Sequence, residues 1–441
     1  MLDAATLVLD VAAPEVWFWA GRSVVLLGFV WLAWRSPLLA LLTWFVASPA
    51  GAYWVPRYNR IELGVIVLAF LLHELRKKTR WKKPELFEWL YGGWCVLIAL
   101  HLIWLSQDPA YWFRLWLDAF VLPFGVYLIA RERTEPEGFG GMRSALLLLG
   151  LLVAGCALIE QIARVDLLPS PQGLRSIYLN SPWLRVNGPY PDDVVLASIA
   201  TFLLLFFLPA AFAPAEESAG RGRVLMRGVC LLLGLAVVFT FSRTFWGIVV
   251  VGGVTFLAAT GKRFHRLALA GVLLAVLLAA ALLYRQADSS EFLRERVLNP
   301  ANLYGRVATY RTVWEMAREH PWTGVGFGNF TAAAWSRPAQ PFRGVLPVDQ
   351  PHSGYFLLLA ETGLPGLALF LLAFGCVLRP AVSLFRRSPT AAGAGLAVGS
   401  FLAANLVFTL LLIPGVNHLV FLLLGILVGR HRSGAVGKPP G

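Results

Sequence analysis

Apolar runs of about twenty residues recur along this chain, and they decide what it can fold into. A helix of that length crosses a hydrocarbon core of roughly 30 Å. Because lipid offers backbone groups no hydrogen-bond partner, a spanning segment is either a helix or a barrel strand. Barrel strands alternate apolar and polar residues, whereas segments such as 145–162 and 267–283 are apolar on every face. The sequence therefore predicts an all-α, polytopic membrane protein.

The composition agrees with this fold class. Of the 441 residues, 58% are hydrophobic and 14% are charged, and a soluble domain needs more polar surface than this. The net charge of +13 comes from basic residues spread over short segments between the apolar runs, so we expect no nucleic-acid binding. The four cysteines stand alone inside apolar runs, which predicts neither a disulfide nor a metal site. No basic region or cleavage site precedes the first run, so we expect no removable signal peptide.

We predict about twelve transmembrane helices from thirteen candidate runs. The runs lie near residues 16–34, 37–54, 61–75, 89–106, 112–130, 143–163, 194–213, 224–241, 244–260, 265–284, 354–378, 391–412 and 414–429. The segments 37–54 and 414–429 are the weakest of them, and Pro49 interrupts the former.

Basic residues follow every second run, and the positive-inside rule places those segments in the cytoplasm. The segments between them then face outward; they are 107–111, 164–193, 241–245 and 285–353. We accordingly predict three parts. These are an N-terminal transmembrane bundle (1–284), a periplasmic loop (285–353), and C-terminal transmembrane helices with a cytoplasmic tail (354–441).

The periplasmic loop is too long for a simple connection, so we expect it to be structured. Apolar residues recur there at spacings of three and four, at Val307, Tyr310, Trp314 and Ala317. This spacing predicts an amphipathic helix that lies on the membrane surface or covers a cavity, and His320-Pro321 closes it. A glycine-rich run over 324–330 lacks the flanking strand and lysine of a phosphate loop, so we interpret it as a tight turn.

Three polar residues on the predicted outer face are candidates for chemistry. Arg243 lies where two apolar runs meet with almost no loop; it either snorkels to the interface or holds a phosphate with its planar fork. Arg306 begins the predicted amphipathic helix and is either a surface residue or a second such cation. His352 directly precedes a long apolar run. It is either an interfacial polar residue or a proton acceptor, since its free pKa is about 6.5.

Two further charged residues are candidates for substrate binding. Glu361 lies nine residues after His352 inside an apolar run, where a carboxylate is costly unless paired, and structural pairing is favoured over catalysis. Arg185 adds another outward positive charge. Asp192 and Asp193 are interpreted as caps of the run that begins at residue 194, with sugar contact as the alternative.

Three segments together resemble one family. Residues 351–366 begin with Pro351-His352 and include Glu361-Thr362-Gly363. They resemble the late signature of bacterial O-antigen ligases and O-antigen polymerases. Residues 305–330 are similar to the outward-loop motif of that superfamily, and 241–244 resemble its Ser-Arg turn. The matches occur in the family's order, within roughly residues 180–370.

The resemblance implies a metal-independent, inverting glycosyltransferase without a cofactor, in the bacterial inner membrane with its active site facing the periplasm. The donor would be a glycan on undecaprenyl pyrophosphate. His352 would be the general base for the acceptor's sugar hydroxyl, and Arg243 and Arg306 would bind the departing pyrophosphate. A pyrophosphate leaves readily when fixed positive donors meet its growing charge, and arginine supplies them.

The acceptor stays open within this resemblance, which points to lipopolysaccharide or surface-polysaccharide biosynthesis. A ligase transfers a whole glycan to lipid A core, a polymerase extends a growing glycan, and a third kind of member modifies proteins. The single compact outward loop favours a ligase. A lipid-linked glycan transporter is the alternative from another class, but transporters usually show two related halves, which this sequence lacks. A scaffold leaves the arginine–histidine set unexplained.

Overall fold

The computed structural model describes residues 21–54, 58–76, 83–134, 136–165, 167, 185–190, 192–212, 220–260, 301–338, 341–347 and 350–432. Within these ranges the chain forms helices and turns and no β-strand, apart from one isolated bridge between Phe342 and Val345. The predicted all-α class is therefore confirmed for the described residues.

Several of the described helices are long and apolar enough to cross a membrane. Seven meet both criteria: Leu86–Trp104, Pro109–Glu132, Phe139–Ala163, Asp193–Ala211, Gly222–Phe239, Gly354–Leu384 and Pro414–Arg432. Shorter apolar helices are Pro37–Pro49, Arg243–Ala259 and Pro389–Ala404. The chain is thus a multi-pass membrane protein. The total of about twelve spans and the side on which 285–353 lies stay predictions, and the run expected at 265–284 is outside the described residues.

The helices fall into two compact units, described here separately. Unit 1 comprises Met1–Trp81 and Glu135–Leu149. Its helices α2 (Pro37–Trp54) and α3 (Tyr58–Arg76) pack against each other, and it includes the first part of α7 (Pro136–Ala163). Unit 2 comprises Lys82–Thr134 and Gly150–Gly441, and it contains every candidate site residue. The predicted division into three parts stays a prediction.

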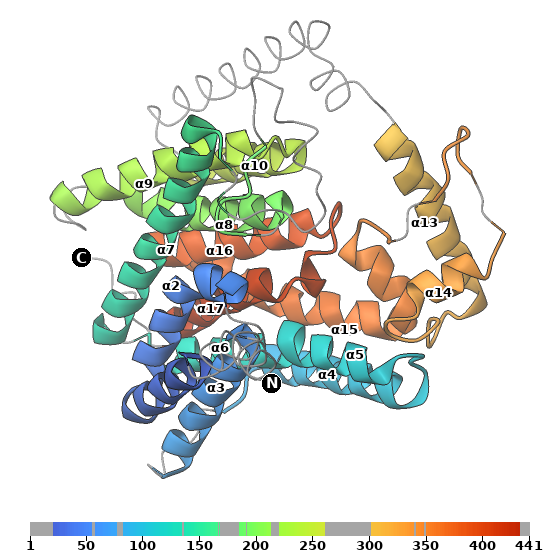
Figure 1. Ribbon diagram of the computed structural model, residues 1–441, viewed down its shortest axis with the longest axis horizontal. Coiled ribbons are helices and arrows are strands. Elements are labelled where there is room, and N and C mark those ends of the chain that lie inside the picture. Colours follow the sequence, from blue (N-terminus) through green and yellow to red (C-terminus); the bar gives the residue numbers. More distant parts are fainter. Residues whose placement is uncertain are drawn as a thin grey trace, which may run out of the picture. The chain divides into compact units, whose positions relative to one another are not determined.

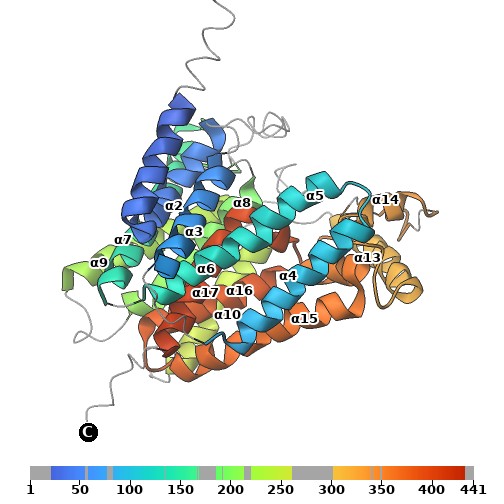
Figure 2. The same cartoon turned by 90° about the horizontal axis from the view of Figure 1, so that it is seen from below.

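Unit 2 holds the rest of α7 and the remaining helices (Figures 1 and 2). In chain order these are α4 (Leu86–Trp104), α5 (Pro109–Trp116), the π-helical η1 (Leu117–Val121), α6 (Leu122–Glu132), α8 (Asp193–Ala211), α9 (Gly220–Phe239), α10 (Arg243–Thr260), α13 (Ala301–Glu319), α14 (Phe330–Trp335), α15 (Gly354–Leu384), α16 (Pro389–Ala404), η4 (Leu410–Leu412) and α17 (Pro414–Arg432). The main packed pairs are α17 with α6, α16 with α8, α8 with α9, α15 with α4, and α13 with α15.

Capping side chains start the helices around the site. Asp192 caps α8 by accepting from the Val194 N–H at 2.6 Å, as the sequence predicts, whereas Asp193 forms an ion pair with Arg185 instead. Ser353 caps α15 and accepts from the Phe356 N–H at 3.5 Å. Each cap fixes where its helix begins, and with it the residues just before the first turn.

Helix α15 is broken at Gly363, where φ is +65° and ψ is −168°. The Glu361 carbonyl would bond residue 365 in a regular helix, but Pro365 has no N–H. Residues 324–328, which we call the glycine turn, replace the missing donors. The Val325 N–H donates to the Ala360 carbonyl at 2.9 Å, and the Gly326 N–H donates to the Glu361 carbonyl at 3.0 Å. The predicted tight turn is therefore present. It serves as a structural joint, by which we mean that its N–H groups bind the carbonyls left free at the break in α15.

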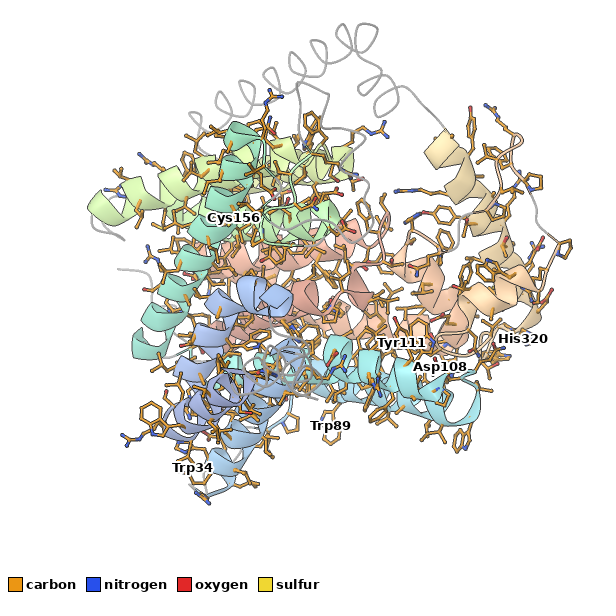
Figure 3. All side chains as sticks on the ribbon, in the orientation of Figure 1. Trp34, Trp89, Asp108, Tyr111, Cys156 and His320 are labelled. Atoms are coloured by element: carbon orange, nitrogen blue, oxygen red, sulfur yellow. The ribbon has the colours of Figure 1, made fainter. Side chains whose placement is uncertain are left out.

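Asn329, the residue after the glycine turn, binds the connection between α4 and α5. The Asn329 amide donates to the Leu105 carbonyl at 2.7 Å and accepts from the Gln107 N–H at 3.0 Å. Figure 3 labels Asp108, which caps α5 at the end of this connection, and His320, which follows α13. These bonds join α15, the turn and the α4–α5 connection at one place.

Helix α13 ends at Glu319, so His320-Pro321 closes it as predicted, but its buried face matches the predicted one only in part: Ala317 is buried and Trp314 is not. Trp314, expected on the buried face, is 52% exposed and lies beneath the Arg318 guanidinium at 5.2 Å. Val313 and Met316 are buried instead, against Leu357 and Ala360 of α15 among others. The small Val313 and the unbranched Met316 allow α13 and α15 to approach closely, while the amphipathic Trp314 stays outside.

Candidate functional site

Arg243 is the first residue of α10, directly after a turn of three residues. Phe241 within this turn has a left-handed backbone with φ of +52°. The Thr240 hydroxyl donates to the Val237 carbonyl at 2.7 Å, and the Trp246 N–H donates to the Ser242 carbonyl at 3.1 Å. The turn is thus closed at both ends, and the exposed Arg243 side chain leaves it next to the buried Phe245.

Aromatic rings link Arg243's helix to Arg306. Phe245 stacks on Phe408, with ring centroids 5.5 Å apart and an interplanar angle of 12°. The guanidinium carbon of Arg306, on α13, lies 5.5 Å from the centre of the same Phe408 ring. Burial, and less strongly the positive charge of Arg243, lower the pKa of Arg306. The two cations are therefore close enough to repel each other.

His352 lies beside Arg306, in the segment that leads into α15. Its backbone carbonyl accepts from the Tyr310 hydroxyl of α13 at 3.3 Å. Burial first, and the charge of Arg306 second, lower the pKa of the half-buried His352 from 6.5. The imidazole is consequently neutral at physiological pH and able to accept a proton.

The turn after α16 holds the start of α15 in place. The Gly354 N–H donates to the Asn405 carbonyl at 2.8 Å and to the Phe408 carbonyl at 3.0 Å. The Asn405 side chain accepts from the Leu411 N–H at 3.1 Å. A Cβ on Gly354 would lie 2.5 Å from the Asn405 side-chain oxygen, so only glycine permits this approach. The same turn thereby fixes both His352 and Phe408.

The structure thus brings Arg243, Arg306 and His352 together from three separate segments. Tyr310, Asn405 and Phe408 complete the surroundings, and sequence reasoning missed all three. Asn405 offered a signal, since it is a lone amide inside an apolar run. Two adjacent cations beside a neutral imidazole are suited to bind a dianion and to take up a proton.

The other two candidates lie in different surroundings. Glu361 is 2% exposed; one carboxylate oxygen accepts from the Phe330 N–H at 3.1 Å, and the other has no hydrogen-bond partner. It therefore holds the segment after the glycine turn, as the favoured structural interpretation expects. Arg185 forms an ion pair with Asp193 and donates to the Thr240 carbonyl at 3.2 Å, beside the turn that carries Arg243.

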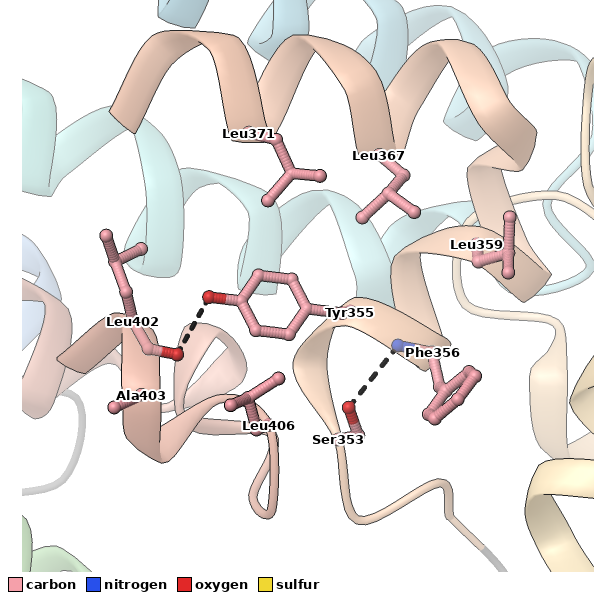
Figure 4. Close-up of a pocket in the computed structure, with 9 residues that line it drawn as sticks. All are labelled: Ser353, Tyr355, Phe356, Leu359, Leu367, Leu371, Leu402, Ala403 and Leu406. Carbon is pink, nitrogen blue, oxygen red and sulfur yellow. Dashed lines mark hydrogen bonds between the residues drawn. The ribbon is translucent and has the colours of Figure 1, made fainter. Parts of the chain in front are cut away.

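An apolar groove of about 530 Å³ begins at Ser353, the residue after His352 (Figure 4). Its walls come from both halves of α15 and from the end of α16, and they are Ser353, Tyr355, Phe356, Leu359, Leu367, Leu371, Leu402, Ala403 and Leu406. The Tyr355 hydroxyl turns away to donate to the Leu402 carbonyl at 2.7 Å, so its ring rather than its polar end faces the groove. A hydrocarbon chain fits such a lining.

The fold and the site together define a class of protein. This class is a multi-pass helical membrane protein with a cationic site at the end of its spans. Residues 228–371, about a third of the chain, match the family model described as O-antigen ligase. The match includes Arg243, Arg306, His352 and Glu361 but not Arg185, and it supports the O-antigen ligase superfamily. That family implies a glycosyltransferase-type membrane enzyme with lipid-linked glycan substrates. A comparison with curated proteins found no match.

Proposed function

We propose that this protein transfers a glycan from undecaprenyl pyrophosphate to a sugar hydroxyl of lipid A core, at the periplasmic face of the bacterial inner membrane. The observation that carries the proposal is the meeting of Arg243, Arg306 and His352 at one place. The family match over the same residues supports the type of chemistry. The compact outward segment favours a ligase over a repeat-unit polymerase.

Arg243 and Arg306 bind the pyrophosphate of the donor. Their mutual repulsion is relieved when a group with two or more negative charges lies between them. Each planar guanidinium presents paired N–H donors to phosphate oxygens. The Phe408 ring holds Arg306 from one side, so less side-chain freedom is lost on binding. Because the arginines supply the charge, the step proceeds without a metal ion.

His352 takes the proton of the acceptor hydroxyl. As the proton moves to the imidazole, the hydroxyl oxygen attacks the anomeric carbon of the donor sugar. The bond from that carbon to the pyrophosphate oxygen breaks, and its electron pair stays on the pyrophosphate. The two arginines stabilise the charge that develops there, and attack opposite the leaving group inverts the anomeric centre. The lowered pKa keeps His352 in the neutral form that the step requires.

The apolar groove beside His352 takes the first part of the donor's hydrocarbon tail. Its lining of leucine, phenylalanine and tyrosine side chains is about as apolar as the surrounding lipid, so the tail enters the groove at little cost and gains close packing contacts there. The groove begins one residue from the base. A lipid anchor there places the pyrophosphate at the end of the helices.

Transfer by the purified, full-length protein tests the proposal. The protein in lipid nanodiscs is given an undecaprenyl pyrophosphate-linked glycan and lipid A core, with chelator present, and products are separated by gel and mass. We expect glycan on lipid A core, and no transfer by His352→Ala. His320→Ala is the matched control, because that exposed histidine ends α13 and lies outside the site. Near-normal transfer by His352→Ala would overturn the role of the base, and strict dependence on a divalent ion would overturn the metal-free step.

The same assay distinguishes the polymerase. Without lipid A core, a polymerase lengthens the glycan on the lipid donor, whereas a ligase leaves the donor unchanged. Lengthened lipid-linked glycan would replace the ligase assignment by the polymerase one. Passage of intact donor across a membrane without transfer would favour the transporter.

A further inference from the structure

Arg185 lies where a short connecting segment crosses the end of α9. Its Nε–H donates to the Thr240 carbonyl at 3.2 Å, and its guanidinium is paired with Asp193 at the start of α8. The neighbouring Val186 N–H donates to the Phe239 carbonyl at 3.2 Å. The last carbonyls of a helix lack partners within the helix. Here two successive residues of the segment supply donors to the end of α9.

Glu160 of α7 fixes that segment from the other side. It is fully buried, and one carboxylate oxygen accepts from the Asn187 N–H at 2.9 Å and the Gly188 N–H at 2.7 Å. Gly188 has φ of +57°, so the two successive N–H groups converge on one anion, as in a backbone nest. The other carboxylate oxygen accepts from the Leu167 N–H at 3.2 Å. One carboxylate thus holds residues on both sides of the connection.

These contacts end at the turn that carries Arg243. Phe239 and Thr240, whose carbonyls are bound, are followed by only two residues before Arg243 begins α10. So short a stretch of chain transmits a displacement of its anchored end almost undiminished. The place of Arg243 is therefore set by Arg185, which is itself held by Asp193.

We infer that Arg185 and Asp193 are positioning residues for Arg243, with Glu160 as their anchor, and that Arg185 is not itself a ligand of the substrate phosphate. The inference rests on the proposed function, in which Arg243 binds the donor pyrophosphate. A side chain that already bridges a carboxylate and a carbonyl holds the turn, while Arg243 extends from it beside Arg306. Sequence alone presents Arg185 as one more outward cation that could bind substrate.

Asp193→Asn separates positioning from direct binding. If Arg185 positions Arg243, loss of the ion pair loosens the Thr240 contact. A misplaced Arg243 makes weaker charge-assisted hydrogen bonds to the donor pyrophosphate, so we expect the donor KM to rise about tenfold or more. If Arg185 binds phosphate directly, Asp193→Asn frees its guanidinium, and the donor KM stays the same or falls. That second result would overturn the inference.

Glu319→Gln is the matched control, because it removes a comparable ion pair, between Arg337 and Glu319, away from this turn. We expect it to leave the donor KM unchanged, and Asp193→Asn to melt at the same temperature as the natural protein. A lower melting temperature together with a proportional loss of all activity would mark the pair as merely structural and would also overturn the inference.

Hydrogen exchange supplies a readout that needs no transfer activity. In Asp193→Asn and in Glu160→Gln, we expect faster exchange of backbone amides in peptides covering 185–190 and 240–246, with no change around α14. Unchanged exchange in both peptides would refute the positioning role whatever the reaction is. Arg243→Lys tests the underlying function: if that variant is fully active while exchange rises as expected, the positioning stands and the phosphate-binding role of Arg243 falls.

Discussion

Replacing Gly324 by alanine tests whether the glycine turn is a structural joint. Gly324 has φ of +61°, a left-handed conformation that costs an L-residue about 1–2 kcal/mol. A Cβ there would lie 2.5 Å from the Ala360 carbonyl oxygen and 2.7 Å from the Glu361 carbonyl oxygen. These atoms are backbone and cannot rotate away, so the turn itself must move off α15.

Moving the turn breaks the bonds from the Val325 and Gly326 N–H groups to α15. A buried polar group left without its partner costs about 1–3 kcal/mol. With the two carbonyls of α15 unpaired and the backbone strain added, Gly324→Ala should destabilise the protein by roughly 3–8 kcal/mol. Because Pro365 cannot donate, no local bond of the helix replaces the one that Glu361 loses.

Gly344→Ala is the matched control. Gly344 also has a positive φ, +78°, in the same connecting part of the chain, but a Cβ there meets nothing within 4 Å. Only the backbone strain of about 1–2 kcal/mol applies, partly offset by the smaller conformational freedom of alanine in the unfolded chain. Both variants have the same chemical change, so their difference isolates the contact with α15.

The assay is thermal unfolding of the detergent-solubilised protein, followed by the fraction that stays monodisperse on size exclusion. We expect Gly324→Ala to unfold at a clearly lower temperature than Gly344→Ala. If the two variants unfold together, the account of the joint is wrong. If Gly324→Ala keeps full stability but loses donor binding, the glycine turn is a phosphate loop after all.

Two further predictions concern Arg306, beside His352, and Glu361, beside the glycine turn. Arg306→Gln removes a cation that lowers the pKa of His352, so that pKa should rise. Because the neutral imidazole is the active form, the acidic limb of the residual kcat/KM profile should shift to higher pH. An unshifted limb would show that the charge of Arg306 does not act on the pKa of His352. Glu361→Ala leaves the Phe330 N–H without its acceptor, and the loss should be about 1–3 kcal/mol of stability with an unchanged donor KM. A raised donor KM at full stability would instead make Glu361 a substrate ligand.

Features that depend on local sequence were predictable. The apolar runs locate helices in the described part of the chain, Asp192 caps α8, and His320-Pro321 closes α13. The outward position of the three candidate residues follows from alternating basic segments and stays a prediction. Their meeting at one place was a hypothesis that needed three-dimensional contacts, since they come from segments more than forty residues apart.

Features that depend on distant partners were not predictable. The spacing in α13 indicates an apolar face, but only the packing on α15 shows that Val313 and Met316 belong to the buried face and that Trp314 does not. The break inside α15 at Gly363 is completed by residues 325 and 326, which precede it by more than thirty positions. A periodicity describes one helix alone, so it cannot reveal which other backbone supplies a missing donor.

Three polar residues inside apolar runs share one role in this structure. Glu160, Glu361 and Asn405 are all buried, and each accepts hydrogen bonds from backbone N–H groups at a turn or helix end. At such places the backbone has unpaired groups, and in a membrane protein water is scarce, so a buried acceptor stabilises the turn more than it would on a wetted surface. Arg243 and His352, in contrast, stand at the ends of runs, and Arg306 lies on α13 between two runs. In these three cases the polar residue inside a run holds a turn or a helix end, while the three groups suited to chemistry lie at the ends of runs or between them.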